Sequence, residues 1–117
     1  MDLEFQGTTV NFATGGVEID HSQPPVLMVH GAGMDRTVWS QQTRYLAHHG
    51  FSAMAVDLPG HGDSSGELLS TIDEMADWLA GLIRSLDLGP VRLVGHSMGC
   101  LIALETAARH GDVTERL

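Results

Sequence analysis

Basic residues and cysteine are both scarce in this sequence. Its 117 residues include six Lys and Arg against fifteen Asp and Glu, which gives a formal net charge of −9. Nucleic-acid-binding proteins normally carry a basic patch, so this balance argues against a nucleic-acid partner and against docking on anionic lipid. The single cysteine excludes an internal disulfide framework and is typical of a reducing compartment.

Long apolar runs, repeats and linkers are missing as well. No apolar run approaches the roughly 18 residues that a membrane-spanning helix needs. The first residues, 1–5, lack the basic start and long apolar stretch of a signal peptide. No Pro- or Ser-rich linker divides the chain, and 43% of its residues are hydrophobic, which is enough for a core. We therefore expect one soluble, cytoplasmic domain over residues 1–117.

Uninterrupted apolar runs alternate with helical patterns along most of the chain. Runs without polar alternation are typical of strands buried on both faces of a parallel sheet. The alternation predicts an α/β fold, a three-layer α/β/α sandwich whose mostly parallel sheet begins with an antiparallel hairpin. The expected strands are 3–5, 9–12, 26–30, 52–58 and 91–95, and the expected helices are 35–49, 72–86 and 97–110.

The apolar run 91–95 leads into Gly95-His96-Ser97-Met98-Gly99, which fits the pattern G-x-S-x-G between a strand and a helix. In this nucleophile elbow the serine sits on a strained turn, so its hydroxyl projects above the sheet edge. The glycines allow close backbone packing, and the helix N-terminus offers N–H groups to a developing oxyanion. The alternative interpretation is a glycine-rich turn in which Ser97 merely caps the helix.

Two further loops follow the other parallel strands: His30-Gly31-Ala32-Gly33 and the stretch from Asp57 to Ser64. Together with the elbow, they resemble the N-terminal portion of the α/β-hydrolase fold family, of the serine hydrolase or esterase type. The resemblance covers essentially the whole chain. It implies that Ser97 is the nucleophile and that the backbone N–H groups of Ala32 and Met98 form the oxyanion hole. Serine at the elbow counts against the family's dehalogenases and epoxide hydrolases, which use aspartate there.

Other conspicuous residues have a structural interpretation that we favour. We expect His30 to hydrogen-bond nearby loops and Asp57 to belong to a structural turn. Cys100 is expected to be a packed thiol, and Met34 and Trp39 to pack against a helix, although either could touch a substrate. The histidines are scattered over different elements, so we expect no metal site and no cofactor.

The resemblance also implies a catalytic acid and a histidine after the nucleophile, and this chain offers no suitable pair. His110 lies thirteen residues beyond Ser97 on the same expected helix, roughly 20 Å away. Glu105 is also too far, because a general base must lie within about 3 Å of its proton donor. The chain is thus interpreted as a fold truncated after the nucleophile helix, without the C-terminal strands or cap. Its strand 91–95 would then be an exposed, aggregation-prone edge.

The leading hypothesis is a serine hydrolase that acts on a small-molecule ester or related carbonyl substrate through an acyl-enzyme, and that is inactive as this 117-residue fragment. The alternative is a non-catalytic ligand-binding or interaction protein on a partial fold. It could self-associate through the exposed sheet edge. A dinucleotide-binding domain is disfavoured, because Gly31-Ala32-Gly33 after the strand 26–30 continues without the third glycine of G-x-G-x-x-G.

Overall fold

A six-stranded mixed sheet forms the centre of the computed structural model, which describes all 117 residues. The strands follow the order β1-β2-β4-β3-β5-β6 across the sheet. They are β1 Asp2–Phe5, β2 Thr8–Ala13, β3 Pro25–Val29, β4 Ser52–Val56, β5 Val91–Gly95 and β6 Thr114–Arg116. The helices are α1 Ser40–Ala47, α2 Ile72–Leu86 and α3 Met98–Arg109, with the short 3₁₀ helices η1 Arg36–Trp39 and η2 Gly111–Val113.

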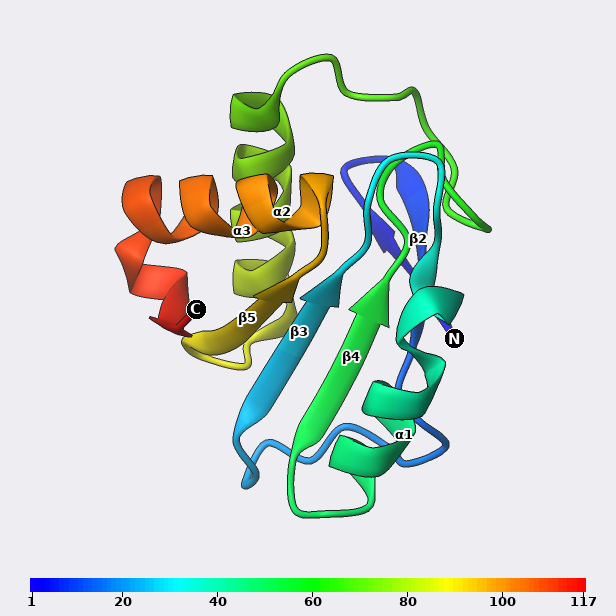
Figure 1. Cartoon of the computed structure of the whole chain (residues 1–117), viewed down its shortest axis with the longest axis vertical. Coiled ribbons are helices and arrows are strands. Elements are labelled where there is room, and N and C mark those ends of the chain that lie inside the picture. The colour runs from blue at the N-terminus through cyan, green and yellow to red at the C-terminus, as the bar shows by residue number, and fades with distance from the viewer.

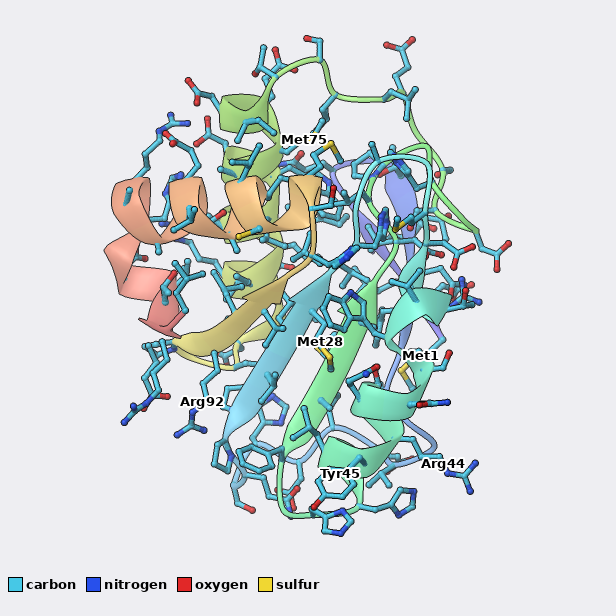
Figure 2. All side chains as sticks on the ribbon, viewed as in Figure 1. Met1, Met28, Arg44, Tyr45, Met75 and Arg92 are labelled. Atoms are coloured by element: carbon cyan, nitrogen blue, oxygen red, sulfur yellow. The ribbon has the colours of Figure 1, made fainter.

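The predicted fold class is confirmed. The hairpin β1–β2 is antiparallel, whereas β4, β3, β5 and β6 are mutually parallel. Alternate residues of β3 serve the two faces: Leu27 and Val29 join the core under α2 and α3, and Val26 and Met28 join a smaller cluster under α1. Figure 2 shows Met28 on the sheet beside α1. The sheet is therefore sandwiched between helices.

Helix α2 follows the predicted pattern closely. The Thr71 hydroxyl oxygen accepts a hydrogen bond from the Glu74 N–H at 3.0 Å, which caps the first turn. The Glu74 carboxylate reaches back to the Ser70 N–H at 3.2 Å, one residue earlier than in a standard capping box. Leu79 and Leu82, from the predicted apolar stripe, are completely buried. No helix in the chain is long and apolar enough to cross a membrane.

The helix expected over residues 35–49 is shorter and begins differently. Asp35 accepts a hydrogen bond from the Thr37 N–H, which starts the 3₁₀ helix η1 before α1 begins at Ser40. Helix α1 ends at Ala47, two residues before the expected end. The side chain of Asp35 thus sets a tight first turn that hydrophobic periodicity does not reveal.

The prediction that the strand 91–95 is an uncovered edge is wrong for its first half. After α3, η2 turns the chain back and β6 pairs in parallel with β5, with Val91 opposite Thr114 and Arg92 opposite Arg116. Figure 1 shows the C-terminus at the beginning of β5. The second half of β5 has no strand partner on this side, and Val94 is 38% exposed.

Candidate active site

Three loops meet at one edge of the sheet. Strands β4, β3 and β5 are parallel neighbours, so their carboxyl ends point the same way. Figure 1 shows these three arrowheads side by side, with the loops after β3 and β4 and the start of α3 gathered beyond them. The predicted functional segments all lie in these loops, which is where ligands bind in open α/β sheets.

Ser97 has a strained backbone at the turn between β5 and α3. Its φ of 57° and ψ of −123° lie in a region that non-glycine residues rarely adopt. Such a conformation costs about 1–3 kcal/mol and persists only where the surroundings enforce it. Ser97 stands directly before α3, yet its side chain caps none of the helix N–H groups. The structure therefore does not support the helix-cap interpretation, and the exposed Ser97 side chain is free.

The two glycines of the elbow are required by close backbone contacts. A Cβ on Gly95 would lie 2.4 Å from the Gly99 carbonyl oxygen, and a Cβ on Gly99 would lie 2.1 Å from the Val29 carbonyl oxygen. At distances this short, a Cβ at either position would force the neighbouring backbone to move, so glycine is strongly favoured at both. The turn is closed by hydrogen bonds from the Gly99 N–H to the His96 oxygen and from the Cys100 N–H to the Ser97 oxygen, each 2.9 Å.

The loop after β3 lies directly beside the serine. A Cβ on Gly31 would lie 3.1 Å from the Ser97 Cβ, and the Met34 N–H donates to the Gly31 oxygen at 3.2 Å. Ala32 follows Gly31 at the exposed tip of this turn. The N–H groups of Ala32 and Met98 donate to no acceptor among the turn and loop hydrogen bonds. Two unused donors thus flank the close contact between Gly31 and Ser97.

His30 is buried beneath this loop and uses both ring nitrogens internally. The Leu58 N–H donates to Nε2 at 3.1 Å, so Nε2 is the acceptor, and Nδ1–H donates to the Gly31 oxygen at 2.7 Å. Burial lowers the pKa of His30, which keeps the ring neutral. The side chain therefore joins the loops after β3 and β4, as the structural interpretation predicted.

Asp57 is completely buried and also joins the loops after β3 and β4. Its carboxylate accepts hydrogen bonds from the Arg36 N–H at 2.7 Å, the Arg36 guanidinium at 2.5 Å and the Asp63 N–H at 2.9 Å. A Cβ on Gly62 would lie 2.4 Å from the carboxylate, so glycine is needed there. The sequence analysis did not identify Arg36 as the partner of Asp57. Two signals were available: Arg36 closely follows the glycine-rich loop 31–33, and Asp57, directly after an apolar strand, needs a cation to compensate its charge.

A small apolar cavity of about 290 Å³ opens beside the elbow. It is lined by Met34, Val38, Trp39, Gln42 and His96. The Trp39 and His96 rings meet edge to face, with centroids 6.5 Å apart. Trp39 also packs against the cluster under α1, so it combines the two interpretations considered from sequence. The largest cavity, about 640 Å³, lies between β2 and α1 and contains none of the predicted site residues.

The acids and histidine after Ser97 lie away from the elbow. Helix α3 has 12 residues, about 18 Å, and His110 follows its far end. There Nε2 of His110 lies 2.7 Å from the Asp77 carboxylate, and this hydrogen bond lowers the pKa of Asp77. The expectation for Cys100 is wrong, because its side chain is exposed. The buried face of α3 is formed instead by Gly99, Ile102, Ala103 and Thr106.

Comparison with known proteins agrees with this geometry. The sequence pattern described as alpha/beta hydrolase fold matches residues 24–117. The chain is 35% identical to the (E)-2-((N-methylformamido)methylene)succinate hydrolase of Acinetobacter baylyi, over 80% of this chain and 35% of that protein. It is also 35% identical to the pimeloyl-[acyl-carrier protein] methyl ester esterase of Vibrio cholerae, over 79% of this chain and 34% of that protein.

Among solved structures, a bacterial membrane phospholipase A superimposes with a TM-score of 0.87 at 29% identity. The match covers 97% of this chain and 36% of that one. The chain thus spans about a third of the length of the relatives that it matches. Because the family pattern covers most of its residues, the chain belongs to the α/β-hydrolase fold family.

Proposed function

We propose that this chain is the nucleophile-bearing part of a serine hydrolase that cleaves a small-molecule ester or related carbonyl substrate. The observation that carries the proposal is the backbone of Ser97, which has a positive φ and an uncapped, exposed side chain. Strain of this kind is stored where function requires it. The hydrolase and methyl ester esterase among the relatives support cleavage at a carbonyl carbon.

In the proposed reaction, the Ser97 hydroxyl oxygen attacks the carbonyl carbon while its proton passes to a histidine outside this chain. The negative charge on the carbonyl oxygen is stabilised by the N–H groups of Ala32 and Met98. The leaving alcohol takes the proton from that histidine, and an acyl-enzyme remains on Ser97. Water, deprotonated by the same histidine, then releases the acid. The reaction needs no cofactor.

The position of His110 supports the second part of the proposal, that the 117-residue chain is inactive alone. The length of α3 separates this histidine from Ser97, and its Nε2 already pairs with Asp77. Loss of the general base of a serine triad can reduce turnover by about 10⁶-fold. The remaining oxyanion contacts give only weak residual activity.

The test uses the protein in which this chain occurs, whose intact mass is measured first from the native source. A mass well above 12.6 kDa indicates that residues outside the chain complete the site. We expect a fluorophosphonate probe to label this protein and an ester panel to yield turnover, with both lost in Ser97→Ala. Ser85→Ala, on α2, is the control and retains both. Wild-type protein that neither reacts with the probe nor turns over any ester would eliminate the hydrolase proposal.

A second candidate, an interaction protein that self-associates, is favoured by two observations. Beyond the pairing with β6, the second half of β5 has no strand partner, and Val94 is partly exposed. Leu101 and Leu104 on α3 are also about half exposed, at 55% and 49%. Exposed apolar patches and open sheet edges favour association.

A further inference from the structure

We propose that Asp57 and Arg36 are positioning residues that hold the loop after β3 so that the Ala32 N–H faces the reacting carbonyl oxygen. This inference rests on the proposed hydrolase function and adds two residues to it. Neither residue touches the reacting atoms. Both act through the backbone of the oxyanion loop, defined here as residues 31–35.

The oxyanion loop is pinned at both ends. Its first residue, Gly31, follows His30 directly after β3 and contacts Ser97. Its last residue, Asp35, is followed by Arg36, whose N–H donates to Asp57 Oδ1 at 2.7 Å. Between these ends, the loop has one backbone hydrogen bond of its own, from Met34 to Gly31. The conformation at Ala32 therefore depends on both anchors.

The far anchor is itself rigid. Asp57 directly follows β4, and its N–H donates to the Asn11 oxygen at 2.9 Å, which joins it to β2. Its carboxylate is completely buried, so free rotation of this side chain is excluded by its surroundings. A hydrogen bond to Asp57 thus ties the start of η1 to the central sheet.

The carboxylate of Asp57 interacts with loop residues and not with residues of the hydrophobic core. A buried carboxylate costs several kcal/mol unless charged or N–H donors compensate it. Each of the three donors that do so comes from a loop or from η1: the N–H and guanidinium of Arg36 and the N–H of Asp63. The attraction therefore acts on loop position. The outer contact, from the Arg36 guanidinium to the Asp63 carboxylate at 3.1 Å, is exposed and contributes little.

This arrangement matters for catalysis because oxyanion donors act over short distances. An N–H group must lie within about 2.7–3.1 Å of the developing oxyanion, and a misplacement of about 1 Å can reduce the rate by about 10²-fold. Releasing the far anchor lets the Ala32 N–H move by such an amount. Of the five residues that line the neighbouring cavity, only Met34 belongs to the oxyanion loop, so the predicted loss is mainly in kcat.

The experiment compares Asp57→Asn and Arg36→Met with the control Asp112→Asn in the protein that carries this chain. Asp112 forms an exposed pair with Arg84 at 2.9 Å, so the control removes an Asp–Arg pair far from the elbow. We measure kcat per serine titrated with fluorophosphonate, which removes the effect of misfolded molecules. We expect kcat to fall about 10- to 100-fold in Asp57→Asn, with KM within about twofold and the control unchanged.

Arg36→Met should lose less activity, because the N–H of residue 36 can still donate to Asp57. This gradation separates positioning from simple stability, which a thermal melt of each variant reports. An unchanged kcat per titrated serine in both variants would overturn the proposal. If Asp57→Asn does not fold, the value of kcat per titrated serine in Arg36→Met, which retains the buried carboxylate, tests the proposal by itself.

A second measurement does not need activity. In the protein that carries this chain, the backbone order parameter of the Ala32 amide reports how rigid the loop is. We expect an order parameter of about 0.85 in the wild type and below about 0.6 in Asp57→Asn, with no change in Asp112→Asn. An unchanged value refutes the positioning role. Loss of order in Asp57→Asn without any wild-type turnover would instead retain positioning and reject the hydrolase function.

Discussion

Gly99, in the first turn of α3, packs against the end of β3 so tightly that a Cβ atom on it would lie 2.1 Å from the Val29 carbonyl oxygen. The same Val29 oxygen accepts a hydrogen bond from the His96 N–H at 3.2 Å. The residues on both sides of Ser97 are therefore held against the end of β3, and this contact keeps Ser97 in its strained conformation.

Gly99→Ala is expected to destabilise the chain by about 1–3 kcal/mol or more, because the methyl group collides with backbone that cannot move aside. Chemical denaturation of the 117-residue chain measures the loss. Gly111→Ala is the matched control, since a Cβ at Gly111 meets nothing within 4 Å. Equal stability of the two variants would contradict the packing described here.

Ser97→Gly is expected to stabilise the fold while removing the proposed nucleophile. A glycine adopts φ near 57° without the steric cost that serine incurs, and the gain is reduced by the chain entropy of glycine. We expect a net increase of about 1 kcal/mol in the free energy of unfolding. Ser97→Ala retains the strain and should show no such gain. A Gly variant no more stable than the Ala variant would show that the turn is not strained.

The free energy of unfolding is expected to decrease as the pH is lowered, because His30 is buried in its neutral form. Its pKa is lowered from 6.5 in the folded chain by burial, so below about pH 6.5 the unfolded chain binds a proton that the folded chain does not. The stabilisation is complete above pH 6.5 and is lost as pH falls towards the folded pKa, by up to about 1.4 kcal/mol per pH unit. Denaturation between pH 7.5 and 5 measures it. Parallel pH profiles for wild type and His30→Asn would rule out this contribution.

Removing β6 is expected to increase self-association. A chain ending at Val113 leaves the whole of β5 without a partner on its outer side, where Thr114–Arg116 pair in the intact chain. Unpaired edges of apolar strands template association. Sedimentation velocity should show larger species than for the 117-residue chain, while removal of Leu117 alone should have little effect. Identical sedimentation of all three would argue against association through this edge.

Local pattern in the sequence predicted strands β1 to β5, α2 and α3, because each rests on short-range chemistry, whereas β6 was not expected. The apolar run before His30 is buried on both faces of the sheet, and Thr71 with the following 3.6-residue stripe specifies α2. The run before His96 was expected to be buried in the same way, but only Val91 and Leu93 are buried, whereas Val94 is exposed. The motif around Ser97 also specified the elbow, since two glycines and a serine at this spacing fit one kind of turn. The parallel order of the strands then predicted which loops meet.

Tertiary structure alone decided the links between those loops. The bond from Arg36 to Asp57 joins residues 21 apart, and that from Leu58 to His30 joins residues 28 apart, so no periodic pattern reveals either. The exposed side of Cys100 and the pairing of β6 on β5 likewise follow from which surfaces are already covered when the chain folds. Such contacts depend on distances between segments, and these are set only once the sheet has brought the segments together.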